Sequence, residues 1–127
     1  ADLGAWVART QVEMAGSQQP AQAASLPTVI SMVENGAERM LAWDRRVALA
    51  VVLARGQRMD LAREQVRKCL AAASEENLRS LTSAPLYRLL YLAKTFDLAI
   101  ADTESRALAL ELLPSEMRSR LASVPSR

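Results

Sequence analysis

The stretch that decides the fold is residues 43–73, which read WDRRVALAVVLARGQRMDLAREQVRKCLAAA. Its first half, residues 45–55, is apolar on nearly every side of a helix, and Asp44 directly before it is a good N-cap. Gly56 ends this helix as the residue that follows its C-cap. The pattern therefore predicts a helix that is buried on most of its surface.

A second helix follows at once over residues 61–73, with Asp60 as its N-cap. Its apolar side chains fall on one face, and Cys69 lies within that face. We therefore expect the thiol to be buried and unreactive, because no partner base for it is apparent. A short connection between two such helices predicts antiparallel neighbours.

The remainder of the chain also predicts helices, and no segment shows the sustained alternation of a strand. One of these helices carries a stripe of Ile30, Val33, Ala37, Met40 and Leu41, with Gly36 in its middle. Ser83 is the expected N-cap of another, and Asp102 can cap a restart within the helix after it. The further helices are expected over residues 3–15, 28–41, 75–82, 85–95, 97–112 and 115–123. The fold class is all-α.

Three regions follow from this pattern. Residues 1–16 form an N-terminal helix, and residues 17–27, which hold two prolines and little charge, form a linker. Residues 28–127 form the helical domain, of a size usual for one domain. The chain begins without a methionine, which fits either a processed protein or a fragment of a longer one.

The composition disfavours most catalytic and metal chemistry. The chain has no histidine, one cysteine and four scattered glycines, so it lacks histidine-based triads, cysteine-rich zinc sites and phosphate-binding glycine loops. The acidic groups fall at expected helix starts, where carboxylates cap. We expect no enzyme activity of its own, no cofactor and no metal site.

The charge distribution bears on nucleic acids and membranes. Residues 39–68 carry eight basic and three acidic side chains, and the preference for Ala, Leu and Arg is typical of a GC-rich bacterial genome. Apart from Trp43, no aromatic residue interleaves with these arginines, so nucleic-acid binding is disfavoured against a solvated helix face. The longest nearly apolar run, residues 47–54, is too short to span a bilayer.

Two segments of the chain look alike. Leu53–Ala62 and Leu92–Ala99 share a Leu-Ala-cation triplet, and their Met-Asp-Leu-Ala and Phe-Asp-Leu-Ala motifs are 37 residues apart. A period of this size is typical of helical-hairpin repeats.

Residues 43–76 resemble a degenerate tetratricopeptide repeat, and residues 83–116 resemble a weaker second copy. Arg46 stands where that family usually has Trp, and Ser74 where it often has Pro. The positions that match in the first copy are Leu49, Ala50, Leu53, Met59, Ala62, Val66 and Cys69. The resemblance implies stacked antiparallel hairpins over residues 43–116, with residues 115–123 as a capping helix. A helical bundle without repeats is the alternative.

The matched positions yield specific expectations. Ala62 and Ala99 should lie at close helix contacts. Arg55 and Lys94 should face one groove and meet an acidic or carboxylate-ended protein or peptide; alternatively, each only complements the dipole of its helix. The expected partner-binding residues are Arg55, Lys94, Tyr87, Tyr91, Val51 and Leu90.

The sequence thus favours a non-enzymatic protein–protein interaction module, a scaffold that is part of a larger protein or complex. Two alternatives stay open. One is a helical accessory domain of a larger enzyme, and the other is a small helical nucleic-acid-binding protein. The tyrosine pair, at i and i+4, can serve a peptide as a hot spot or can belong to the core.

Overall fold

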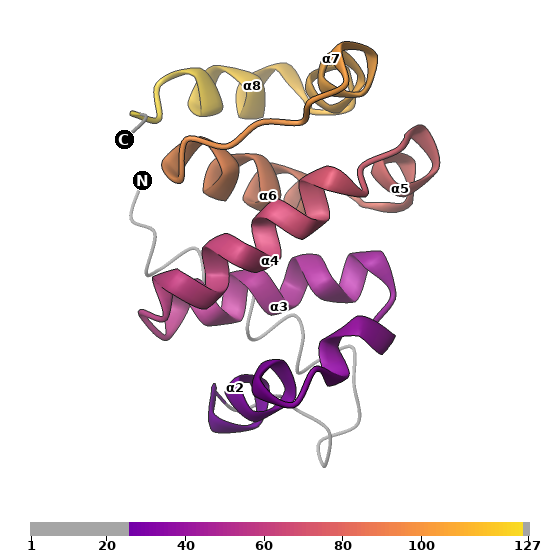
Figure 1. The fold of residues 1–127 in the computed structure, drawn as a ribbon. Helices are drawn as coiled ribbons and strands as arrows, with labels where there is room; N and C mark the ends of the chain where they lie inside the picture. Colours follow the sequence, from indigo (N-terminus) through magenta and orange to yellow (C-terminus); the bar gives the residue numbers. More distant parts are fainter. Residues whose placement is uncertain (1–25, 126–127) are drawn as a thin grey trace. The chain divides into compact units, whose positions relative to one another are not determined.

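A computed structural model describes residues 26–125, and within that range the chain forms α-helices, one 3-10 helix and no strand. The all-α prediction is confirmed. The elements are α2 (Leu26–Glu34), η2 (Ala37–Met40), α3 (Trp43–Arg55), α4 (Met59–Ala71), α5 (Glu75–Ser80), α6 (Ser83–Thr95), α7 (Thr103–Glu111) and α8 (Ser115–Ala122) (Figure 1).

The predicted N-terminal helix over residues 1–16 lies outside the described residues, as does most of the linker. Leu26 and Pro27, expected to end that linker, instead begin α2. Proline suits the first turn of a helix because its missing N–H would have no partner there.

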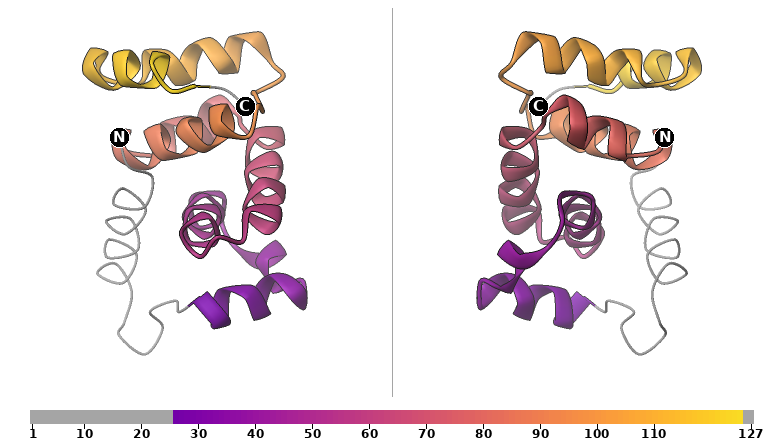
Figure 2. Two further views of the ribbon diagram at one scale, coloured as in Figure 1. Left: turned by 90° about the vertical axis from the view of Figure 1, so that its left-hand side faces the viewer. Right: turned by 90° about the vertical axis from the view of Figure 1, so that its right-hand side faces the viewer.

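The helices belong to two compact units, residues 1–65 and 66–127, with the boundary inside α4. In the first unit α2 packs against α3 and against η2. In the second unit α5 packs against α7, and α6 lies along α8 (Figure 2). The stacking of hairpins into a repeat array stays a prediction.

Helix α3 supplies the largest group of buried side chains in the first unit. Val47 and every residue from Leu49 to Ala54 are at most 3% exposed, which confirms the predicted burial on most sides. The helix begins earlier than expected, with Ala42 as its N-cap and no side-chain capping bond. Asp44 therefore lies in the first turn, where its charge complements the helix dipole.

The predicted continuous helix over residues 28–41 is wrong from Gly36 onward. Gly36 has a left-handed backbone (φ +80°), so α2 ends at Glu34 and the chain restarts as η2. This change of direction rotates the side chains that follow: Met40 is 88% exposed, whereas Glu38 is buried. The guanidinium of Arg46, in α3, donates to the Glu38 carbonyl at 3.2 Å and holds η2 against α3.

Helices α3 and α6 end in the same Schellman motif. In α3 the N–H of Gln57 donates to the Ala54 carbonyl, and the N–H of Arg58 donates to the Leu53 carbonyl. The left-handed residue is Gln57 (φ +64°), while Gly56 has φ −78°. Gly56 is therefore the C-cap, one position earlier than the sequence predicts.

In α6 the same two hydrogen bonds run from Asp97 to Lys94 and from Leu98 to Ala93, and Asp97 is left-handed (φ +59°). The chain then stays non-helical as far as Asp102. The Asp102 side chain accepts from the Ser105 N–H at 2.9 Å and caps α7, as the sequence predicts.

This course corrects one expectation about the two matched alanines. The helix expected over residues 97–112 begins only at Thr103, so Ala99 lies in a loop and is exposed. Ala62 is fully buried in α4, and the burial of Cys69 is confirmed. A left-handed residue at Asp97 turns the chain out of the helical path that the repeat pattern assumes.

The remaining helices follow the sequence closely. Ser74 caps α5 by accepting from the Asn77 N–H at 3.1 Å. Helix α6 starts after Thr82 rather than after Ser83, and its proline, Pro85, lies in the first turn. Helix α8 begins directly after Pro114.

Gly56 makes a close approach whose energetic effect can be measured. A Cβ at this position would overlap the two methyl groups of Leu26. The cost of this overlap should exceed the stabilisation that alanine gives by restricting the unfolded chain, so Gly56→Ala should destabilise the protein by about 1 kcal/mol. In a Leu26→Ala background the same change should stabilise, because φ −78° suits alanine. Urea unfolding of the wild type, the two single variants and the double variant gives the coupling energy between positions 26 and 56. Equal effects of Gly56→Ala in both backgrounds would contradict the contact.

Candidate functional site

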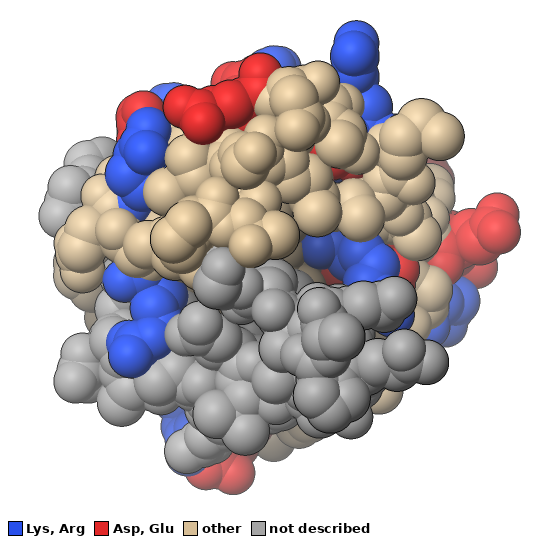
Figure 3. Space-filling model, turned by 90° about the horizontal axis from the view of Figure 1, so that it is seen from below, with Lys and Arg blue, Asp and Glu red and all other residues tan. Residues whose placement is uncertain are grey.

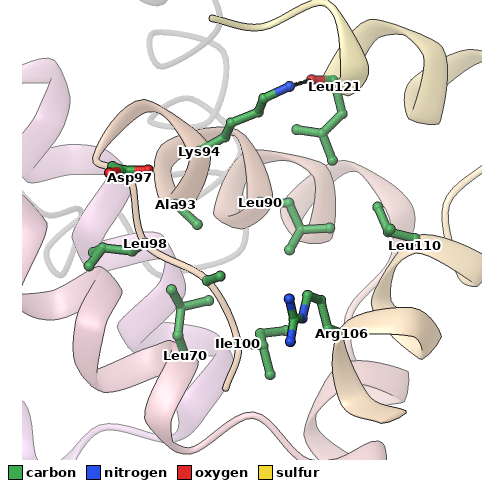
Figure 4. A pocket seen from close by; sticks show the side chains of 11 residues that line it. Leu70, Leu90, Ala93, Lys94, Asp97, Leu98, Ile100, Arg106, Leu110 and Leu121 are labelled. Atoms are coloured by element: carbon green, nitrogen blue, oxygen red, sulfur yellow. Dashed lines mark hydrogen bonds between the residues drawn. The ribbon is translucent and has the colours of Figure 1, made fainter. Parts of the chain in front are cut away.

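The second unit contains a cavity of about 320 Å³. Its walls come from the end of α4, the last turns of α6, the loop after α6, and helices α7 and α8 (Figure 4). The lining residues are Leu70, Leu90, Ala93, Lys94, Asp97, Leu98, Ala99, Ile100, Arg106, Leu110 and Leu121. Eight of these eleven residues are apolar, so the cavity is suited to an apolar group.

The loop after α6 provides one wall because of the Schellman motif. After the left-handed Asp97, the chain runs through Leu98, Ala99 and Ile100 without forming a helix. Ile100 is 3% exposed, so its side chain is held firmly among its neighbours. At the opposite edge Leu110 is 42% exposed, which leaves the cavity open to solvent along α7.

Lys94 joins two helices at this site. Its Nζ donates to the carbonyl oxygen of Leu121 at 2.9 Å and to that of Ala122 at 3.1 Å (Figure 4). These carbonyls belong to the last turn of α8, where backbone acceptors have no partner within the helix. Lys94 therefore caps α8 from α6, a more specific role than complementing the dipole of its own helix.

Arg106 reaches the cavity from the first turn of α7. Its guanidinium group points from α7 toward the cavity beside Ile100 (Figure 4). None of residues 26–125 forms a hydrogen bond or an ion pair with this guanidinium. Its charge acts on Asp102: hydrogen bonds from Ser105, together with the charge of Arg106, hold the pKa of Asp102 below its ordinary value.

The structure brings together two of the six predicted partner-binding residues, Lys94 and Leu90, at this cavity. Tyr87 and Tyr91 do not line it; their ring centroids are 6.0 Å apart with a tilt of 53°. Burial, with a smaller effect of Tyr91, raises the pKa of Tyr87. Tyr87 is 8% exposed and Tyr91 is partly exposed, and a role of the tyrosine pair in partner binding stays a prediction.

The other two predicted residues belong to the first unit. Val51 is 1% exposed within α3, and Arg55 is exposed at the end of that helix. A site shared by Arg55 and Lys94 therefore stays a prediction.

The sequence analysis missed Arg106, Leu110 and Ile100. One available signal is the spacing of Arg106 and Leu110, which at i and i+4 share a helix face. The other is the apolar pair Leu98 and Ile100 just before the N-cap Asp102, since an apolar loop beside a helix start usually packs against something.

One face of the described surface is mixed in charge. On the face in Figure 3, basic and acidic side chains of the described residues are interspersed with uncharged ones. No helix within residues 26–125 is long and apolar enough to cross a membrane. The same part of the chain contains no group of three or more acidic or cysteine side chains that could hold a metal ion.

Comparison with known proteins gives no family for this chain: no family model, no curated protein and no solved structure matches it.

The capping role of Lys94 can be tested by substitution. Lys94→Met removes both hydrogen bonds to α8, and it should destabilise the chain by about 1–2 kcal/mol and speed hydrogen exchange of the α8 amides. Arg118→Met, which changes an exposed cation on α8 itself, is the matched control and should have little effect. Unchanged exchange in Lys94→Met would show that α8 does not depend on this cap.

The cap of α7 predicts a dependence of stability on pH. Folding lowers the pKa of Asp102. The stabilisation that the Asp102 carboxylate gives to the folded state is therefore complete at pH values above its ordinary pKa of 3.8, and it is lost as pH falls through the lowered pKa. Asp102→Asn can still cap but does not titrate. The free energy of unfolding of Asp102→Asn should therefore improve relative to that of the wild type as pH falls from about 5 to about 3, as measured by urea unfolding. A constant difference over this range would argue against a carboxylate cap.

Proposed function

We propose that this chain is a non-enzymatic protein–protein interaction module, part of a larger protein or complex, and that the cavity of the second unit receives an apolar side chain of its partner. The observation that carries the proposal is an apolar cavity of about 320 Å³ whose edge, at Leu110, is exposed. Interfaces gain most of their affinity where a large side chain fills such a site.

The charged residues at this cavity also favour binding over catalysis. The amine of Lys94 is engaged by two backbone carbonyls, and the nearby carboxylate of Asp102 caps α7. Groups used in this way hold helices in place, whereas acid–base catalysis calls for paired titratable groups whose environments separate their pKa values.

The resemblance of residues 43–116 to a tetratricopeptide repeat gives further support, and we propose the same repeat character here. Helices α3 and α6, which start the two matched segments, end in the same Schellman motif. In a helical array of this kind, the groove between hairpins is the natural place for a partner.

The proposal can be tested by filling the cavity from its loop. Ala99 is exposed and lines the cavity, so Ala99→Phe should occupy the space without disturbing a helix. A phage-displayed library of random peptides, selected on the immobilised wild-type chain, provides the ligands. We expect Ala99→Phe to weaken binding of the selected peptides at least about tenfold, since one buried apolar contact is lost.

The matched control is Ala101→Phe, which adds the same ring two positions along the loop at an exposed residue that does not line the cavity. This variant should bind the peptides as the wild type does. The proposal is wrong if the library yields no binding peptide, or if both variants bind as tightly as the wild type.

A further inference from the structure

The charge at the cavity edge points to the chemistry of the partner. We infer that the cavity recognises a continuous protein segment in which an Asp or Glu side chain lies close to a large apolar side chain, with Arg106 binding the carboxylate. This inference rests on the function proposed above and specifies the ligand of the same site.

The first support is the placement of two exposed side chains on one helix. Arg106 and Leu110 both line the cavity, both are exposed, and they lie one turn apart on α7. Side chains at i and i+4 begin about 5–6 Å apart. A cation and an apolar contact are therefore presented together to whatever enters the cavity.

The second support is the charge balance of the lining. Three charged residues line the cavity: Lys94, Asp97 and Arg106. Lys94 is engaged with α8, and in Figure 4 Asp97 lies at the same end of the cavity as Lys94, away from Arg106. The charge of Arg106 also acts on Asp102, but that carboxylate accepts from the Ser105 N–H and no described residue uses the guanidinium donors, so an anion is their complementary ligand.

The third support is the match between guanidinium and carboxylate. A guanidinium group offers a planar fork of N–H donors that can bind both oxygens of a carboxylate. Ile100 lies beside Arg106 in Figure 4, and an apolar neighbour lowers the local dielectric on that side, which strengthens such a pair relative to open solvent.

The open edge along α7 favours a side-chain carboxylate within a chain over a terminal one. Because Arg106 and Leu110 are both exposed, a partner backbone can pass along α7 and continue in both directions. In the partner segment, the carboxylate and the large apolar side chain lie on the same face when their residues are two apart in a strand, or three to four apart in a helix. A C-terminal carboxylate or a free fatty acid offers the same charge but no continuing chain.

The test uses synthetic peptides with blocked ends. Each peptide holds Leu, Phe or Trp at one position and Asp or Glu two, three or four positions away, in an Ala/Ser/Gly background. Each has a matched peptide with Asn or Gln in place of the acid. We expect the best acidic peptides to bind the wild type about fivefold more tightly than their amide counterparts, the size expected for a solvent-accessible ion pair. This difference should shrink at high salt.

Substitutions then test whether Arg106 causes the difference in affinity between the acidic and the amide peptides. In Arg106→Gln the acidic and amide peptides should bind equally, at the affinity that the amide peptides have for the wild type. Arg106→Lys, which keeps the charge without the fork, should retain part of the difference. Arg118→Gln, at an exposed cation on α8 that does not line the cavity, should keep all of it.

The outcomes separate this inference from the proposed function. Equal binding of acidic and amide peptides to the wild type, with affinity lost in Ala99→Phe, overturns the inference and leaves the interaction module in place. If no synthetic peptide binds but library peptides do, only the inference is wrong; if neither set binds, both are wrong. If only peptides with a free C-terminus, or decanoate, show a preference that depends on Arg106, the partner is not an internal acidic segment and the inference is wrong.

Discussion

The left-handed backbone of Asp97 is the constraint on which the second unit depends. Together with the two hydrogen bonds of the Schellman motif, it ends α6 and turns the chain away from the helix axis. The first unit ends α3 in the same way at Gln57, but there the next helix begins within two residues. After Asp97 the chain instead stays non-helical as far as Asp102, and this longer connection supplies the loop wall of the cavity.

The same turn also holds the opposite wall. The backbone carbonyl of Lys94 accepts from Asp97, while its side chain donates to the last carbonyls of α8. One residue thus takes part in closing α6 and in fixing α8, whose Leu121 lines the cavity. The Leu121 carbonyl also accepts from the Val124 N–H at 3.1 Å, so the lysine adds a second donor there and supplies a donor to the Ala122 carbonyl at the helix end.

Apolar surface stays accessible beside these capped helix ends. Helix α7 is short and is fixed at its start by Asp102, and α8 is fixed at its end by Lys94. Leu110 lies in the last turn of α7 and is 42% exposed, one helical turn from Arg106. An apolar site bordered by satisfied polar groups is suited to a partner, because few hydrogen bonds have to rearrange when one binds.

The sequence by itself determined the all-α class, the buried α3, and the capped start of α7, because helix periodicity and capping act between residues a few positions apart. It misplaced the turns at Gly36 and Asp97, since several residue types tolerate both helical and left-handed backbone and the local pattern does not choose between them. The cavity was decided only by the tertiary structure. Its walls come from segments spread over residues 70–121, and Lys94 finds its acceptors 27 and 28 residues away. Such contacts depend on how helices pack, which no local pattern specifies.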